Sequence, residues 1–257
     1  MNFNEQLIAL FTIVRKEVGR FMRIWSQTLL PPVINQSLYF IIFGSFIGSQ
    51  LKPMNGVPYM SFIVPGLVMM AVITSSFANV VSSFFGAKFQ RNIEELMVSP
   101  TPHWVVLLGF VLGGVLRGIL VGAIVFLVSL AFVTPQVAHP FLVILFVTLT
   151  ATVFGLAGFL NAIFATKFDD VSIFPTFVLT PLTYFGGVFY SISNLPPLWQ
   201  SLSRLNPVLY MIDGFRYGFL GQADVDVNLS LSMLCLFVLI LTGLNLYLLK
   251  KGTGLRS

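Results

Sequence analysis

The chain is organised around residues 84–104, which read FFGAKFQRNIEELMVSPTPHW and lie between two long apolar segments. Four charged residues fall close together there, although only 9% of the chain is charged; they are Lys88, Arg91, Glu94 and Glu95. The spacing predicts a short helix over about 88–100 whose apolar side is formed by Phe89, Ile93, Leu96 and Met97. The prolines at 100 and 102 end it, because proline lacks an amide donor and disfavours helical backbone in the preceding residue. This helix is either a surface on which a soluble partner pushes or a solvated loop helix without a partner.

Lipid is the expected solvent for most of this chain, because its 257 residues are 56% hydrophobic and include 27 phenylalanines. The formal net charge of +5 does not indicate nucleic acid as a partner, because the basic residues are scattered between apolar runs as topology signals. The single cysteine, Cys235, excludes an internal disulfide, and His103 and His139 have no further ligands at metal-binding spacing. We therefore expect an all-α membrane protein without a metal site.

Six apolar runs are each long enough to cross about 30 Å of hydrocarbon, which takes roughly 20 helical residues. They cover residues 29–50, 59–84, 105–133, 141–166, 172–192 and 229–249. Three prolines inside these runs are expected to kink them; they are Pro65, Pro175 and Pro181.

Residues 1–28 precede the first span and contain one amphipathic helix over 3–25. Its apolar face comprises Phe3, Leu7, Leu10, Phe11, Val14, Val18, Phe21, Met22 and Trp25. The opposite face carries basic residues, namely Lys16, Arg20 and Arg23. A helix of this kind lies in the membrane interface, packs its apolar face against the spans, or does both.

The distribution of Lys and Arg predicts the orientation of the six spans. An even number of spans puts both termini on one side, where the basic residues are then Arg15, Lys16, Arg20, Arg23, Lys88, Arg91, Lys167, Lys250, Lys251 and Arg256. The other side keeps only Lys52, Arg204 and Arg216. Because basic loops stay in the cytoplasm, we expect both termini and residues 84–104 to be cytoplasmic.

A ladder of small residues runs along the third span; it consists of Gly109, Gly113, Gly114, Gly118 and Gly122. Glycines at this spacing predict close approach of neighbouring helices in lipid. Arg117 lies midway through the same span, where an arginine costs at least about 2.5–3.5 kcal/mol. No acidic residue lies inside the six runs, so we expect its partner to be a carbonyl, a loop carboxylate such as Asp213, or an anionic substrate. A structural role and a substrate contact are both open.

Residues 193–228 form a long and sparsely charged segment between the fifth and sixth spans. Its apolar pieces, 195–202 and 207–217, are too short to cross, which predicts two half-helices that enter the outer leaflet and return. An interfacial hairpin anchored by aromatic residues is the alternative. Asp213 and Arg216 lie three residues apart and are expected to pair on one helix face.

Several motifs resemble those of the ABC-2 type exporter permeases. In the C-terminal half they are PLTYFGGVFY at 181–190, LPP at 195–197, LNPVLY at 205–210 and DGFR at 213–216. Earlier, RNIEELMVSP at 91–100 resembles that family's loop ahead of the third helix, with Asn92 and Glu94 departing from its common Arg-Glu and Leu-Glu pairs. The order and spacing of these motifs match over essentially the whole chain.

The resemblance implies a homodimer of six-helix subunits in the bacterial inner membrane, each held by one of two copies of a separate ABC ATPase. The ATPase would dock on the 88–100 helix through Lys88, Phe89, Arg91, Ile93, Glu94, Glu95, Leu96, Ser99 and Pro100. The N-terminal helix would brace that contact. The first, second and fifth spans would line the transport route, with Asn35, Tyr39, Phe43, Thr176, Thr180 and Tyr184 as candidates by position, although each is equally placed for packing.

The chain is not expected to hydrolyse ATP itself. A P-loop ends in Lys-Ser or Lys-Thr, and no lysine here is followed by either residue. We therefore expect no cofactor on this chain, and ATP with Mg on the partner ATPase. The leading prediction is the permease subunit of an ATP-driven exporter for an amphipathic, lipid-linked, glycan or drug-like substrate.

Two other functions are weighed against the exporter. An ion-coupled secondary carrier would need ionisable residues buried in the spans, where only Arg117 is present. A membrane-embedded hydrolase would need a nucleophile with a nearby base or a metal pair, and the sequence contains no such constellation.

Overall fold

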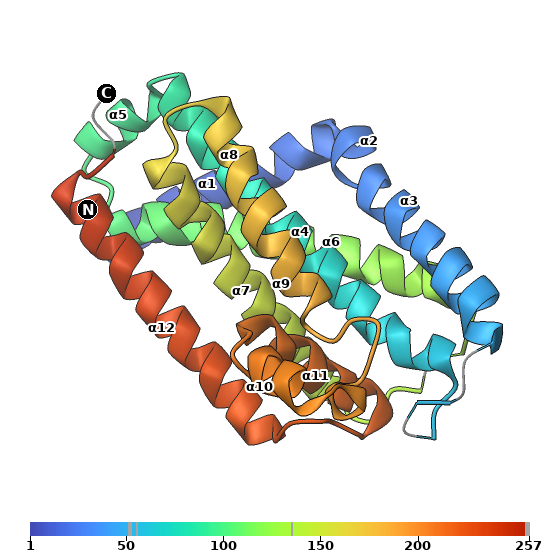
Figure 1. The fold of residues 1–257 in the computed structure, drawn as a ribbon. Coiled ribbons are helices and arrows are strands. Elements are labelled where there is room, and N and C mark those ends of the chain that lie inside the picture. Colours follow the sequence, from blue (N-terminus) through green and yellow to red (C-terminus); the bar gives the residue numbers. More distant parts are fainter. Residues whose placement is uncertain (51–52, 55, 135, 255–257) are drawn as a thin grey trace.

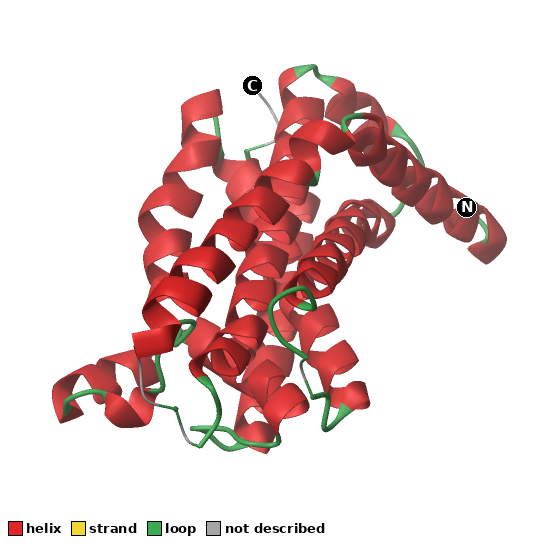
Figure 2. Cartoon of the chain, turned by 90° about the vertical axis from the view of Figure 1, so that its right-hand side faces the viewer, coloured by secondary structure: helices red, strands yellow, loops and turns green. Residues whose placement is uncertain are grey.

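The computed structural model describes residues 1–50, 53–54, 56–134 and 136–254, and its regular elements are helices throughout that part (Figures 1 and 2). Two basic residues used to predict the orientation, Lys52 and Arg256, lie outside the described residues. Four of the described helices are long and apolar enough to cross a membrane, and they coincide with four of the predicted runs. They are α4 (Tyr59–Phe89), α6 (His103–Ser129), α7 (Pro140–Phe164) and α12 (Val227–Lys251).

Helix α4 forms the centre of the bundle and packs against α6 and α7. It is apolar on all sides, as is typical of a helix surrounded by other helices. The ring of Phe84 lies 4.1 Å from that of Phe159 on α7 and 5.3 Å from that of Phe110 on α6. Helix α12 is the opposite case, because it leaves large apolar side chains exposed along its length, including Leu236, Leu239 and Tyr247. Such a surface is suited to contact with lipid.

The other two predicted runs are each assembled from short helical pieces. The run 29–50 contains α3 (Leu30–Tyr39), a π-helical segment (Phe40–Ile47) and a 3₁₀ turn (Gly48–Gln50). The run 172–192 contains α8 (Phe168–Phe174), a second π-helical segment (Pro175–Leu179) and α9 (Thr180–Tyr184). Pro175 opens the second π-helical segment, where its missing amide removes a regular helical hydrogen bond. Helix α9 ends at Tyr184, so the predicted end of this run at residue 192 was wrong. The helix does not continue because Gly187 turns the chain with a φ of 77°.

Helices α1 (Phe3–Arg23) and α2 (Trp25–Thr28) precede the bundle, and α1 lies across it (Figure 1). The glycine ladder of α6 makes this possible and is confirmed as a close-approach surface. A Cβ atom on Gly109 would lie 2.5 Å from Ile13, and one on Gly113 would lie 2.5 Å from Cβ of Glu17. The remaining ladder glycines, Gly114, Gly118 and Gly122, meet α4 in the same way.

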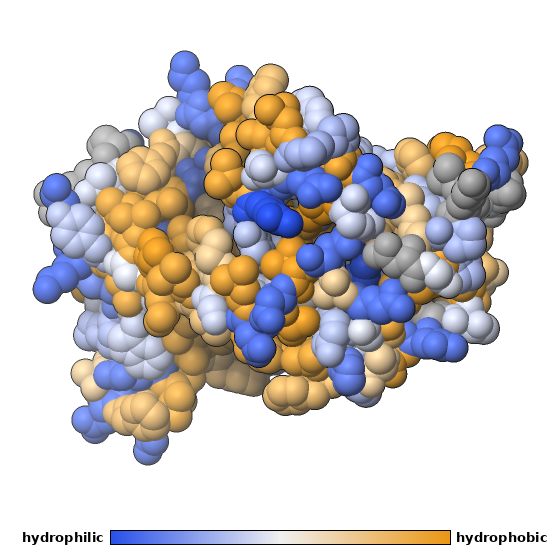
Figure 3. All heavy atoms as spheres, turned by 60° about the horizontal axis from the view of Figure 1, so that its bottom comes forward, coloured by the Kyte–Doolittle hydropathy of each residue, from blue (hydrophilic) through white to orange (hydrophobic). Residues whose placement is uncertain are grey.

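Short helices mark the two ends of the bundle. At one end, which we call the α5 end, α4 passes into α5 (Asn92–Val98). At the other, the α11 end, lie a 3₁₀ turn (Ile192–Asn194), α10 (Pro197–Arg204) and α11 (Pro207–Leu220). The two half-helices predicted between the fifth and sixth runs are therefore confirmed as helices, and α11 packs against α4, α7 and α12. Seen toward the α11 end, the surface mixes hydrophilic and hydrophobic residues (Figure 3).

Candidate functional site

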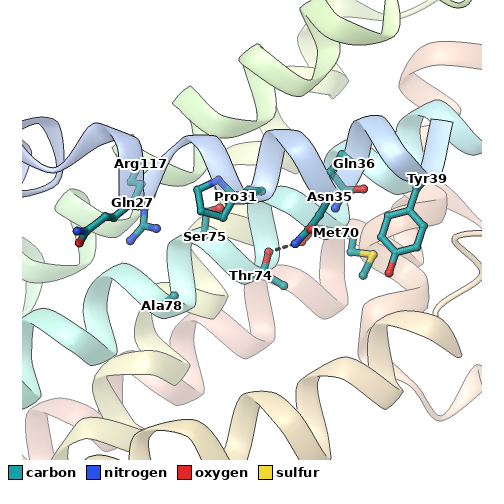
Figure 4. Close-up of a pocket in the computed structure, with 11 residues that line it drawn as sticks. Gln27, Pro31, Asn35, Gln36, Tyr39, Met70, Thr74, Ser75, Ala78 and Arg117 are labelled. Carbon is teal, nitrogen blue, oxygen red and sulfur yellow. Dashed lines mark hydrogen bonds between the residues drawn. The ribbon is translucent and has the colours of Figure 1, made fainter. Parts of the chain in front are cut away.

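Two cavities open on the same stretch of α4 and form the candidate site. The first has a volume of about 350 Å³ and lies between α3, α4 and α6 (Figure 4); its lining residues are Gln27, Pro31, Pro32, Asn35, Gln36, Tyr39, Met70, Thr74, Ser75, Ala78 and Arg117. The second, also about 350 Å³, lies between α4 and the α8–α9 segment; it is lined by Thr74, Phe77, Ala78, Val81, Ser82, Val171, Ser172, Pro175, Thr176, Leu179 and Thr180. Because Thr74 and Ala78 line both, the cavities adjoin across one face of α4.

Arg117 is the cation of the first cavity. Arg117 is 8% exposed, and its Nη2 donates a hydrogen bond to the carbonyl oxygen of Thr28 at 2.9 Å. Thr28 itself is fixed, because its hydroxyl donates to the carbonyls of Phe21 and Ile24. Of the partners expected from the sequence, the structure shows the carbonyl. The alternative pairing with Asp213 was wrong, because that carboxylate pairs with Arg216 at the α11 end.

A buried polar cluster beside this cavity was missed by the sequence analysis. Glu17 on α1 is fully buried, and its carboxylate accepts from the hydroxyl of Ser83 at 2.6 Å. Arg20 contacts the same carboxylate at 3.3 Å and donates to the carbonyl and side-chain oxygens of Asn79 at 3.0 and 2.9 Å. Arg20, predicted on the polar face of the helix, therefore contacts α4, and its side chain is 30% exposed. The spacing of the residues could have indicated that Glu17 is buried. It lies four residues from both Ile13 and Phe21, on the same helix face, and these two residues are buried too.

An aromatic cluster joins three of the six predicted route residues near the α11 end. The hydroxyls of Tyr39 and Tyr184 lie 2.7 Å apart and share a hydrogen bond. The ring of Phe43 lies 5.9 Å from that of Tyr39 and 4.7 Å from that of Phe189. The other three route residues are separate from this cluster: Asn35 lines the first cavity, and Thr176 and Thr180 line the second. Four of the six therefore line the cavities, since Tyr39 also lines the first one. The other two, Phe43 and Tyr184, contact Tyr39.

Helix α5 is shorter than the predicted 88–100 helix. Arg91 adopts a left-handed backbone with φ of 61°, which separates α4 from α5 and leaves Phe89 on α4. Phe89 packs its ring 4.8 Å from Phe168, so its predicted place on the apolar side of α5 was wrong. Of the remaining predicted contact residues, Ile93 is buried, Leu96 and Ser99 are half-buried, and the exposed ones are Arg91, Glu94, Glu95 and Pro100.

Lys88 has an internal role at this end. Its ammonium group donates to the carbonyls of Ile163 at 2.8 Å and Ala165 at 2.7 Å, where α7 ends. A cation at this position satisfies carbonyls that have no partner within their own helix. Lys88 therefore holds the end of α4 against the end of α7.

The predicted pair on α11 is confirmed, with Asp213 and Arg216 3.6 Å apart and both buried. The carboxylate also accepts from the backbone amides of Asp224 at 3.1 Å and Val225 at 2.8 Å. Nη2 of Arg216 donates to the carbonyl of Gly187 at 2.5 Å, and the guanidinium lies 3.9 Å from the ring centre of Phe62. These contacts tie α11 to two loops and to α4.

Comparison with known proteins places these features in a family. The family model for the ABC-2 type transporter matches residues 8–220. The chain is 58% identical over 250 residues to the inner membrane transport permease YadH of Escherichia coli strain K12, covering 97% of this chain and 98% of that protein. It is 22% identical over 238 residues to nodulation protein J of Neorhizobium galegae, covering 92% and 91% of the two chains.

Proposed function

The chain belongs to the ABC-2 type transporter family as a multi-pass inner-membrane transport permease, and from that premise we propose that it is the membrane subunit of an ATP-driven exporter. Two copies would form a homodimer, and each would bind a separate ABC ATPase that carries ATP and Mg. The substrate class is an amphipathic molecule, such as a lipid-linked compound, a glycan or a drug-like compound. In this proposal the separate ATPase hydrolyses ATP, and the chain itself does not.

We further propose that the chain crosses the membrane six times, with the segments 30–50 and 168–184 as the first and fifth spans. Both termini and α5 then lie in the cytoplasm, which agrees with the excess of basic residues on that side. Helix α1 would lie in the interface, since Phe3, Phe11 and Trp25 remain exposed on it and on α2. Helices α10 and α11 would enter the outer leaflet, with the buried backbone of α11 covered by protein.

The observation that carries the proposal is the continuity between α5 and the cavities. Thr74 and Ala78 line both cavities, and α4 runs unbroken from them to Phe89, directly before the turn into α5. Ile93 of α5 is buried in the core, while Glu94 and Glu95 are exposed. An ATPase bound to these carboxylates would therefore displace α4 as a rigid element and so change the cavities.

The transport cycle we propose is a shift between inward-open and outward-open dimers, driven by the different affinities of the ATPase for the two states. The Tyr39–Tyr184 hydrogen bond joins the first span to the fifth near the α11 end. In the proposed orientation this contact lies toward the outer side, where it would hold the first and fifth spans together. Opening outward would require that hydrogen bond to break.

The structure reveals one group that could bind the coupling ion of a secondary carrier. This group is Glu17, a buried carboxylate that the sequence analysis did not consider. Both Glu17 and Asp213, however, already accept hydrogen bonds and pair with an arginine. A coupling-ion site needs a carboxylate that is free to bind and release the ion. The exporter is therefore the better supported proposal.

The test is stimulation of the partner ATPase after reconstitution of both subunits in liposomes. Reversing the charge of α5 with Glu94→Lys and Glu95→Lys should abolish stimulation, because both side chains are exposed and available to a partner. Asp169→Lys is the matched control, since Asp169 is an exposed carboxylate of α8. Unchanged stimulation in the double variant, or equal loss in the control, would contradict α5 as the contact.

A further inference from the structure

The first cavity combines one buried cation with neutral lining. Arg117 and Gln27 lie at one end and Tyr39 at the other (Figure 4). Amide and hydroxyl groups from Asn35, Thr74 and Ser75 line the space between them, and no carboxylate is among the lining residues. The cavity therefore carries a positive charge, has several polar groups in an otherwise apolar lining, and has no carboxylate that would repel an anion.

The charge of Arg117 is not neutralised by a salt bridge within the described residues. The nearby carboxylate of Glu17 is already engaged by Ser83 and Arg20, and the hydrogen bond that Arg117 makes goes to the Thr28 carbonyl. The neighbourhood of the cavity thus contains two arginines and one carboxylate, which leaves one positive charge uncompensated. A buried charge without a counter-charge is unfavourable, and an anion that enters the cavity would supply one.

Three buried polar atoms around the cavity have no hydrogen-bond partner among the described residues: Nε of Arg117, Oγ of Ser75 and Oε1 of Gln36. The three residues are 8%, 2% and 4% exposed, and all three line the cavity. The first two can donate to an oxyanion, and the third can accept from a hydroxyl group. Buried polar groups are normally satisfied, so this set matches a ligand that carries both kinds of group.

The size and surroundings of the cavity indicate which part of a ligand it accommodates. A volume of about 350 Å³ falls at the low end of small-molecule pockets, which is enough for a head group and too little for a whole lipid. On α3, which lines the cavity, Leu30, Ile34 and Leu38 are exposed apolar residues. Acyl or other apolar chains would therefore extend along α3, outside the cavity.

We propose that this cavity binds the oxyanion head group of an amphiphile, with Arg117 as its counter-charge and Ser75 as a further donor. A phosphate supplies the acceptor oxygens that Arg117 and Ser75 lack, and a neighbouring hydroxyl supplies a donor of the kind that Gln36 lacks. The inference rests on the proposed function in one respect, because it narrows the exported class to anionic amphiphiles. The same chemistry occurs in membrane phospholipids and in free phosphate, and the experiment separates these sources.

The test is calorimetric binding to the purified full-length chain in a neutral maltoside detergent. The probes are dioctanoyl phosphatidylglycerol, which is anionic and bears hydroxyls, dioctanoyl phosphatidylcholine, in which choline cancels the phosphate charge, and inorganic phosphate. Phosphatidylglycerol should bind at least about tenfold more tightly than phosphatidylcholine, which is the effect of one charged hydrogen bond. Binding of inorganic phosphate with the same dependence on Arg117 would support the oxyanion site and identify a free anion as its ligand.

Arg117→Gln should remove the preference for phosphatidylglycerol, and Arg117→Lys should retain part of it. Arg23→Gln is the matched control, because Arg23 is an exposed arginine that does not line the cavity. Should Arg117→Gln fail to fold, Ala78→Leu gives an independent test, since it fills the cavity from an exposed position and should weaken binding about tenfold.

Equal affinity for the two lipids in the wild-type chain would overturn the proposal, as would a preference that survives both Arg117→Gln and Ala78→Leu. These assays contain no ATPase, so their result is independent of ATPase coupling. Failure to bind the anionic lipid with normal ATPase stimulation would remove the oxyanion site and leave the exporter. Binding of the anionic lipid by a chain that stimulates no ATPase after reconstitution would keep the oxyanion site and remove the exporter.

Discussion

Two carboxylate–arginine pairs with buried carboxylates occur among the described residues, and they are built differently. In each pair the residues are three apart on one helix, Glu17 with Arg20 on α1 and Asp213 with Arg216 on α11. Charged atoms of the α1 pair are 3.3 Å apart, against 3.6 Å for the α11 pair. Distance alone would therefore rank the α1 pair as the stronger link.

Burial and the remaining partners reverse that ranking. The side chain of Arg20 is 30% exposed, whereas that of Arg216 is 3% exposed. The α1 pair is held by two side chains and one backbone carbonyl of α4, from Ser83 and Asn79, while the α11 pair is held by backbone groups of two loops. Side-chain contacts can rearrange when helices shift, but backbone contacts fix the chain. The comparison teaches that the α11 pair is the more firmly fixed of the two and that the α1 pair is the more adjustable.

The largest effect is expected when the α11 pair is broken. Arg216→Leu leaves the carboxylate of Asp213 buried without its counter-charge and removes the hydrogen bond to Gly187. Loss of one member of a buried pair costs about 3–5 kcal/mol. We expect a loss of that size in the free energy of unfolding, measured in detergent by denaturant titration. Arg204→Leu changes an exposed arginine of α10 and should have little effect; similar losses in both variants would contradict a framework role for the pair.

A smaller effect is expected from Ser83→Ala on the α1 pair. The substitution removes the hydroxyl that donates to Glu17 at 2.6 Å but leaves Arg20 in place. A hydrogen bond to a charged group contributes about 1.5–3 kcal/mol, so the loss should stay below that of Arg216→Leu. Ser82→Ala is the control, because Ser82 is the exposed neighbour and its hydroxyl donates within its own helix. A loss in Ser83→Ala that exceeds the loss in Arg216→Leu would reverse the proposed ranking.

The contrast also explains which features the sequence could predict. The α11 pair was found because both charges lie in one apolar stretch and share a helix face, so local spacing determines it. The four long spans follow from runs of apolar residues, and the close contacts of α6 follow from its glycines. Each of these signals lies within one segment of the chain.

What the sequence did not reveal depends on contacts between distant segments. From the sequence Glu17 looks like a surface residue of an amphipathic helix. It is buried because Gly113 allows α1 to approach α6, and Ser83 of α4 donates a hydrogen bond to it. From the sequence Lys88 looks like an unpaired charge, because its partner carbonyl at the end of α7 is distant along the chain. The left-handed backbone of Arg91, which shortens α5, has no signature in the residue type, since such a conformation normally favours glycine. Arg117 was singled out from the sequence, but its carbonyl partner was one of three possibilities.

The smallest effect is expected in a double-mutant cycle on the α1 pair, with Glu17→Gln, Arg20→Gln and both together. The amide oxygen introduced by Glu17→Gln would still accept from Ser83, so the cycle isolates the charge interaction between the two side chains. Since Arg20 is part-exposed and meets the carboxylate through one nitrogen, the coupling energy should be at most about 1 kcal/mol, as for pairs that water screens. The free energy of unfolding of the four proteins provides the measurement. A coupling of several kcal/mol would mean that the α1 pair is as firmly fixed as the α11 pair, and the contrast between the two pairs would fail.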